Sequence, residues 1–161
     1  MLTAPLVLVP LLIGAEPPAG VAAMPPGVLI EAELFAPAER WEVQTELPGF
    51  SGRGYLVNRS RPAISDTSPR LETVLPKAGR HAVWLRAFCG GPPDSGFHDR
   101  EFSLEVNGVR LQPTHLGVDG ADFTWELAGQ IEVAADRRLE FILHDVGRAE
   151  AMIDALLLTT D

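Results

Sequence analysis

Three acidic side chains lie in apolar surroundings near opposite ends of the 161-residue sequence. Glu31 and Glu33 are two positions apart in residues 30–34, so on an extended strand they would share one face. Asp154 sits within the apolar residues 152–158, where an unpaired carboxylate would carry a large desolvation penalty. A Ca²⁺ ion held by Glu31, Glu33, Asp154 and backbone carbonyls would compensate this charge, because calcium takes hard oxygen ligands in flexible geometry.

The same acids also allow an arrangement without a metal ion. Asp154 would then pair with Arg86 or accept hydrogen bonds from backbone amides, while the two glutamates face solvent. Both arrangements compensate the buried charge of Asp154. They differ in whether the three carboxylates meet, and the sequence leaves both open.

Motifs for catalysis are missing from the sequence. It contains no Gly-x-Ser-x-Gly elbow, His-Glu-x-x-His pair, phosphate-binding loop or dinucleotide-binding fingerprint. The four histidines are scattered, and none has a second ligand at the spacing of a zinc site. Paired carboxylates can hydrolyse glycosides, but only across a cleft that a domain of this size rarely forms. We therefore expect no catalytic residues and no enzyme activity.

The composition indicates a single folded domain with an acidic surface. Hydrophobic residues make up 46% of the chain and charged residues 22%, as is usual for globular proteins. The formal charge of -9 disfavours nucleic acid as a partner, because no basic stripe offsets repulsion by a phosphate backbone. The single cysteine, Cys89, excludes an intramolecular disulfide.

The first residues have the character of an export signal. An apolar run covers residues 2–14 and small side chains follow it, although no Lys or Arg precedes Arg40. The run is short and interrupted by proline, so we expect no membrane span in the mature protein. We expect residues 1–23 to form a signal peptide and linker, residues 28–161 to form the folded domain, and the protein to be secreted or periplasmic.

Short runs of β-forming residues, separated by Gly, Pro, Asn and Asp, fill the rest of the chain. In residues 80–88 bulky side chains alternate on both faces, which indicates a central strand. Asn107-Gly108 predicts a tight hairpin between two alternating runs. Further strands are expected at residues 28–34, 41–45, 54–58, 70–75, 102–106, 109–111, 123–127, 130–133, 138–144 and 152–159. This pattern predicts an all-β fold, a two-sheet β-sandwich.

Five short motifs follow one another along the chain in an order and spacing typical of a known family. They are Ile30-Glu31-Ala32-Glu33, Gly49-Phe50-Ser51-Gly52-Arg53-Gly54-Tyr55-Leu56, Leu75-Pro76-Lys77-Ala78-Gly79 with Val83-Trp84-Leu85-Arg86, Val106-Asn107-Gly108, and Ile153-Asp154-Ala155-Leu156-Leu157-Leu158. Together they resemble the family 6 and family 35 carbohydrate-binding modules over residues 28–160. The resemblance implies a galactose-binding-like jelly roll with a structural calcium ion at positions matching Glu31, Glu33 and Asp154.

The chain is also similar to sandwich domains attached to bacterial flavin-dependent oxidoreductases and polysaccharide-degrading enzymes. Such a domain can bind a sugar or can serve only as a spacer or docking surface. The resemblance therefore implies a calcium-stabilised, non-catalytic module that binds a polysaccharide or oligosaccharide. The alternative is a structural or interaction module accessory to a larger partner enzyme.

A sugar site needs an aromatic face for the apolar side of a pyranose and polar groups for its hydroxyls. Phe97 and His98 lie in residues 89–100, a Gly- and Pro-rich stretch in which nothing demands burial. The resemblance implies that Trp41 and Tyr55 lie near the binding loops. For both of these rings, packing in the core is the favoured alternative.

The family also places an asparagine near the end of the chain, beside the sugar. Residues 144–148 contain no Asn, and Asp145 would supply a hydrogen-bonding group in its place. An aromatic platform is the feature that separates the two functions. If Trp41, Tyr55 and Phe97 all pack inward, the interaction module is favoured.

Overall fold

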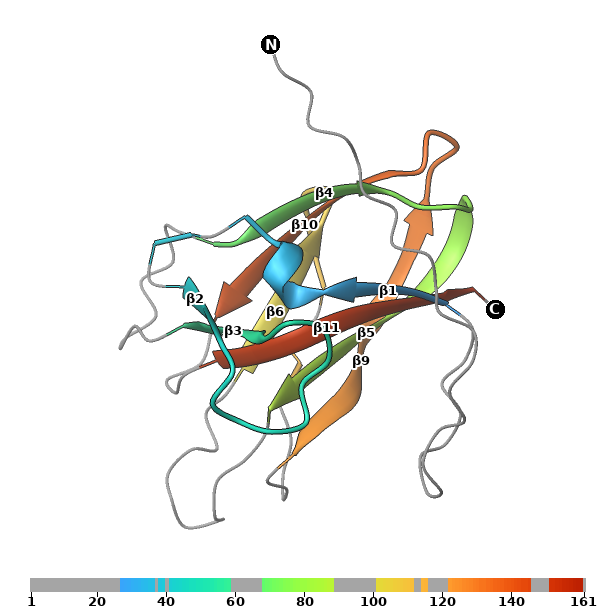
Figure 1. Ribbon diagram of the computed structural model, residues 1–161. Coiled ribbons are helices and arrows are strands. Elements are labelled where there is room, and N and C mark those ends of the chain that lie inside the picture. The colour runs from blue at the N-terminus through green and yellow to red at the C-terminus, as the bar shows by residue number, and fades with distance from the viewer. Residues whose placement is uncertain are drawn as a thin grey trace, which may run out of the picture.

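The computed structural model describes residues 27–36, 38–39, 41–58, 68–88, 101–111, 114–115, 122–145 and 151–160. Within these residues the chain forms strands and one 3₁₀ turn, η1 (Figure 1). They are β1 (Gly27–Glu31), η1 (Ala32–Leu34), β2 (Trp41–Gln44), β3 (Tyr55–Asn58), β4 (Arg70–Val74), β5 (Gly79–Phe88), β6 (Glu101–Val106), β7 (Val109–Arg110), β8 (Thr114–His115), β9 (Phe123–Val133), β10 (Arg138–Asp145) and β11 (Ala151–Thr160). No helix in this part of the chain has the length and apolar character needed to cross a lipid bilayer.

The strands form two antiparallel sheets, so the predicted all-β sandwich is confirmed. Sheet A has six strands in the order β2-β3-β11-β5-β9, with β1 also paired to β11. Sheet B has five strands in the order β4-β10-β6-β7, with β8 paired to β6. In sheet A, β3 pairs with residues 151–153 of β11 and β1 pairs with residues 155–159. Because β5 occupies the opposite edge, β1 and β3 lie one after the other along the same edge of β11.

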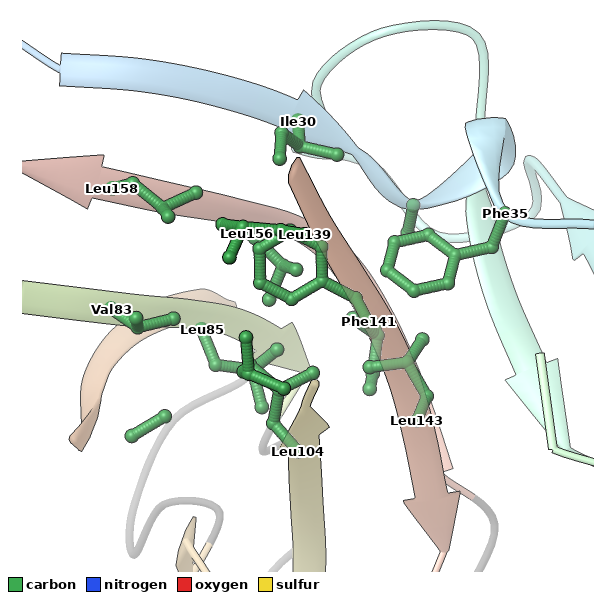
Figure 2. Close-up of a cluster of buried hydrophobic side chains, with 14 of the residues drawn as sticks. Ile30, Phe35, Val83, Leu85, Leu104, Leu139, Phe141, Leu143, Leu156 and Leu158 are labelled. Atoms are coloured by element: carbon green, nitrogen blue, oxygen red, sulfur yellow. The ribbon is translucent and has the colours of Figure 1, made fainter. Parts of the chain in front are cut away.

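The core lies between the two sheets and is built from alternate residues of the central strands. In β5, Val83, Leu85 and Ala87 are buried, while Trp84 and Arg86 between them are only partly buried on the outer face. Figure 2 shows side chains of sheet A and of the segment before β2 packed against sheet B, among them Ile30, Phe35, Val83, Leu85, Leu156 and Leu158 opposite Leu104, Leu139, Phe141 and Leu143. Each fully buried leucine or phenylalanine contributes about 1.5–3 kcal/mol, so this layer dominates the stability of the fold.

The strand pattern of the sequence is interrupted at residues 107–108 and at residues 128–129, and the structure forms a turn only at the first of these places. Asn107 and Gly108 have φ angles of 50° and 79°, and they join β6 to β7 as the predicted tight hairpin. The two strands expected at residues 123–127 and 130–133 are one strand in the structure, because β9 continues through residues 128–129. The pairing of β9 with β5 shifts register between Val83 and Trp84, opposite Gly129, whose φ is 154°. A bulge therefore absorbs the irregular residues, and the strand continues. The two-residue β8 was not predicted from the sequence.

The first strand is shorter than expected. β1 ends at Glu31, and the chain turns through η1, where the Phe35 amide donates to the Ala32 carbonyl at 3.1 Å. The turn buries Ala32 and Phe35, which are 0% and 3% exposed. The prediction that Glu31 and Glu33 share one face of a strand is therefore wrong, because Glu33 lies in the 3₁₀ turn.

Candidate functional site

The three predicted acids meet where β1, β3 and β11 adjoin. The pairing of β11 with β5 shifts register between Ile153 and Ala155, so Asp154 is the extra residue of a β-bulge. On the opposite edge of β11, the pairing with β3 ends at Ile153 and the pairing with β1 ends at Ala155, across from Glu31. Asp154 thus lies in the gap between two strands, and its side chain is fully buried.

Residues 45–54, which connect β2 to β3, pass over this gap (Figure 1). The Ser51 amide donates to Asp154 Oδ1 at 2.8 Å, and the Arg53 amide donates to Glu33 Oε1 at 2.7 Å. The Ser51 hydroxyl lies 2.7 Å from Glu31 Oε2 and 3.0 Å from Asp154 Oδ2. This loop therefore contacts all three carboxylates and connects the end of the first strand to the last strand. We call the three carboxylates the carboxylate cluster.

Gly52 lets this loop approach the two glutamates closely. Its φ is 61°, in the left-handed region that costs residues with a side chain about 1–2 kcal/mol. A Cβ atom at this position would lie 2.4 Å from Glu33 Oε1 and 3.0 Å from Glu31 Cδ. The backbone conformation therefore favours glycine, and any larger residue would displace the Glu33 carboxylate from the loop.

Arg86 reaches the cluster from β5. Its Nη1 atom donates to Asp154 Oδ2, and the two side chains are 20% and 0% exposed. Its Nη2 atom donates to the Gly49 carbonyl at 2.9 Å, which also ties the loop to the sheet. The expected arrangement in which Asp154 pairs with Arg86 and accepts a backbone amide is present. The glutamates depart from it, because both are only partly exposed and both bond to the loop.

The charges of the cluster are incompletely balanced by the described contacts. Burial raises the pKa of Glu31, the nearby Glu33 and Asp154 carboxylates raise it further, and the Ser51 hydrogen bond and Arg86 oppose the shift. Glu33 Oε2 is buried without a hydrogen-bond partner. Within the described residues no three Asp, Glu, His or Cys side chains are arranged so that they could already hold a metal ion. Carboxylate oxygens are the ligands that calcium prefers, and Glu33 Oε2 has no hydrogen bond that would compete with a metal ion.

Two of the aromatic residues predicted for a sugar platform, Trp41 and Tyr55, are buried. Trp41 is 7% exposed and packs in the main core, and Tyr55 is 1% exposed. The Tyr55 ring lies 6.1 Å from that of Phe50 and 5.3 Å from that of Phe123. Rings buried to this degree offer no face to a ligand, so the stacking role expected for Trp41 and Tyr55 is corrected to the packing role weighed beside it.

The remaining predicted ligand-binding residues are not placed by the structure. Phe97 and His98 lie outside the described residues, as does the lone cysteine, Cys89. Asp145 is the last residue of β10, but its side chain is not among those described.

The sequence analysis missed the direct contacts of Ser51, Gly52 and Arg53 with the acids. These residues belong to one of the motifs that carried the family resemblance, so the signal was present as a pattern without a physical role. The missing information was that a loop between two neighbouring strands folds back over the end of a third. Only the pairing of β11 with both β1 and β3 reveals this arrangement.

Among solved proteins, this fold is that of carbohydrate-binding modules. A family 35 module from Paenibacillus barcinonensis matches with a TM-score of 0.63 at 18% identity, covering 84% of this chain and 100% of that chain. A family 35 module from Clostridium thermocellum gives 0.63 at 16% identity, over 84% and 99% of the two chains. The GH26-CBM35 β-(1,4)-mannanase of Podospora anserina gives 0.65 at 20% identity, over 84% of this chain and 28% of that chain.

The comparisons confirm the predicted jelly-roll fold of the family 35 type. No protein-family model matches the sequence, and no curated protein matches it. At identities of 20% and below, the shared feature is the fold.

Proposed function

We propose that this domain binds a polysaccharide or oligosaccharide without cleaving it. The observation that carries the proposal is the structural match to stand-alone carbohydrate-binding modules, which covers 84% of this chain and 100% and 99% of the two neighbouring chains. In this proposal the domain would hold an attached or partner protein on the polymer. Sugar binding then depends on weak stacking and hydroxyl contacts rather than on a reacting group.

The proposed contacts to the sugar come from residues 89–100 and from the end of β10. Phe97 would stack on the apolar face of a pyranose, and His98 and Asp145 would bond to its hydroxyls. With Trp41 and Tyr55 buried, Phe97 becomes the aromatic on which this proposal depends.

Affinity electrophoresis through gels containing mannan, xylan or galactan tests the proposal. We expect the chain to be retarded by at least one polymer, and Phe97→Ala to migrate as in a gel without polymer. Trp125→Ala is a matched control, because it removes an aromatic from the outer face of sheet A. Free migration of the unaltered chain through every polymer would overturn the proposal.

The carboxylate cluster supports a second element of the proposal, a structural calcium ion held by Glu31, Glu33 and Asp154. Its support is the buried, unpartnered Glu33 Oε2 and the raised pKa of Glu31, since both describe anionic oxygens lacking a compensating cation. When bound, calcium would neutralise charge that the fold otherwise leaves uncompensated and would join the first strand to the last. The loop residues Ser51 and Arg53 orient the carboxylates through the hydrogen bonds described above.

We place the mature protein outside the cytoplasm, secreted or periplasmic. The support is the apolar run over residues 2–14 and the substrate class proposed, because polysaccharides that such modules bind lie outside cells. N-terminal sequencing of the protein recovered from a secreting host tests this, with cleavage before residue 27 as the expected result. Recovery of an intact N-terminus inside the cell would contradict it.

One observation favours the second candidate function, an interaction module accessory to a larger enzyme. Two of the three predicted platform aromatics, Trp41 and Tyr55, pack inward. In this case the Phe97→Ala variant would leave the properties of the chain unchanged, and no polymer would retard it. The same electrophoresis therefore separates the two candidates.

A further inference from the structure

A serine, a histidine and a glutamate are joined by hydrogen bonds on the outer face of sheet B. The Ser68 hydroxyl lies 3.2 Å from Nδ1 of His144, and Nε2 of His144 lies 2.9 Å from Glu105 Oε2. The three residues come from different segments: Ser68 precedes β4, His144 lies near the end of β10, and Glu105 lies in β6. We call this set the serine relay. It shares no residue with the carboxylate cluster.

The sheet itself fixes the geometry of the relay. β10 is the central strand, with β4 on one edge and β6 on the other, so a side chain on its outer face can reach both neighbours. In register, His144 is opposite Ser103 and Ile142 is opposite Glu105, which makes His144 and Glu105 a diagonal pair. On the other edge, the Leu143 amide donates to the Pro69 carbonyl at 3.0 Å and holds the residue after Ser68 against β10.

Hydrogen-bonding chemistry then assigns the proton on the imidazole. An ionised carboxylate can only accept, so the Nε2 atom of His144 donates to Glu105. In the neutral ring the Nδ1 atom is therefore unprotonated and accepts from the hydroxyl of Ser68. A base that faces a hydroxyl and is oriented by a carboxylate is the arrangement that activates a nucleophile.

The surroundings keep His144 in this neutral form. Burial lowers its pKa, and the charges of Arg110 and Arg70 lower it further, while Glu105 acts in the opposite direction through its hydrogen bond and its charge. Near neutral pH the ring is therefore free to take a proton.

We propose that Ser68 is the nucleophile of an acyl-transfer site that hydrolyses small carboxylic esters. The Ser68 oxygen bonds to the ester carbonyl carbon as its proton moves to Nδ1 of His144, and the carbonyl electron pair moves onto oxygen. The intermediate collapses with cleavage of the bond to the alcohol, which leaves with the proton from His144. Water repeats the sequence on the acyl-serine, and the products are an alcohol, a carboxylic acid and the free serine.

The neighbouring side chains indicate the size of the acyl group. Arg70 and Glu140 form an ion pair at 2.9 Å beside the relay and are 59% and 38% exposed. Such charged, solvated neighbours offer no apolar surface to a long acyl chain. The site therefore suits acetyl and similarly short esters.

The experiment treats the full chain with p-nitrophenyl acetate at pH 7.5 and measures p-nitrophenolate release and the mass of the chain. We expect acetate to appear on the peptide that contains Ser68, and release to fall about 100-fold in His144→Gln, the usual scale for loss of a general base. Ser68→Ala is expected to fall to the same residual rate. Circular dichroism of each variant establishes that the sandwich is retained.

Matched variants distinguish the relay from general acylation of the surface. Glu105→Gln removes the carboxylate that orients His144 and is expected to lower the rate of release. Glu72→Gln makes the same change on the edge strand β4 of the same sheet and is expected to keep the full rate. The rate in unaltered protein is expected to fall as His144 becomes protonated at acidic pH. Release that is equal in unaltered chain, Ser68→Ala and His144→Gln would overturn the proposal, as would acetylation at other residues only.

Discussion

The carboxylate cluster and the serine relay use similar groups in opposite settings. In the cluster, Asp154 is fully buried and a loop covers it, so each charge depends on partners that only the folded chain supplies. In the relay, the side chains of His144 and Glu105 are 13% and 22% exposed on an outer sheet face. A fully buried carboxylate such as Asp154 therefore depends on partners from the fold itself, whereas the partly exposed side chains of His144 and Glu105 remain accessible from solvent.

Substitution of Asp154 is expected to cause the largest loss of unfolding free energy. Asp154→Ala leaves Arg86 without its buried partner and removes two hydrogen bonds to Ser51, and we expect a loss of about 3–5 kcal/mol in unfolding free energy. Urea denaturation measures it. The control is Asp136→Ala, since Asp136 lies in an exposed turn. Equal, small losses in both variants would remove the distinction between the two settings.

Calcium should stabilise the cluster and leave the relay unchanged. At a free concentration 100 times the dissociation constant, the gain is about 2.7 kcal/mol, seen as a higher melting temperature that a chelator reverses. Glu33→Gln should abolish the gain, and His144→Gln should not. The raised pKa of Glu31 implies that acidification weakens the calcium effect, because the bound form requires the ionised carboxylate. A melt insensitive to calcium and chelator at neutral pH would exclude the ion.

Gly52→Ala tests how closely the loop must approach the cluster. We expect a loss of about 1–2 kcal/mol from the left-handed backbone conformation, together with displacement of Glu33 and a weaker calcium response. Gly49→Ala is the matched control: its φ is also positive, at 89°, but its Cβ would meet nothing within 4 Å. If both variants respond to calcium as the unaltered chain does, contact between the loop and the glutamates is not required.

His144 of the relay should make a smaller contribution to the unfolding free energy, and this contribution should depend on pH. The folded state lowers the pKa of His144, so below pH 6.5 the unfolded chain binds more protons than the folded chain. This contribution to the unfolding free energy is therefore present above pH 6.5 and is lost as pH falls from there through the lower pKa of the folded state. Urea unfolding at pH 7.5 and pH 5.5 measures it. The decline should be smaller in His144→Gln than in the unaltered chain, and an equal decline would assign it to other groups.

The smallest effect is expected for an exposed ion pair beside the relay. Arg70 and Glu140 are 59% and 38% exposed, and pairs of this kind contribute about 0–1 kcal/mol. Glu140→Gln should therefore change the unfolding free energy by less than Asp154→Ala does, with weak dependence on salt. A loss comparable to that of Asp154→Ala would show that burial does not separate the two regions.

Much of the fold was predictable because strand periodicity is local. Alternation in residues 80–88 and the turn at Asn107-Gly108 each depend on neighbouring residues, and both are present in the structure. The errors occur where tertiary packing overrides the pattern. Ala32 and Phe35 turn into the core and end β1 early, and the bulge opposite Val83 joins the two strands expected at residues 123–127 and 130–133 into β9.

The candidate site was predictable only in part. Asp154 stood out because a carboxylate inside an apolar run requires a partner, and that argument needs no coordinates. Whether an aromatic packs or binds could not be decided from type and spacing, because a tyrosine such as Tyr55 can fill either role, although packing was favoured. Its burial against Phe50 and Phe123 depends on the loop that covers sheet A.

The β-sandwich, its hairpin and the need to compensate the charge of Asp154 could all be predicted from the amino-acid sequence, since they follow from side-chain alternation, turn chemistry and the cost of burying charge. Which groups meet depends instead on how the strands pair. Glu31 and Asp154 adjoin because β1 and β3 share an edge of β11. Ser68, Glu105 and His144 adjoin because β10 pairs on both edges, and 76 and 39 residues of chain separate His144 from its two partners.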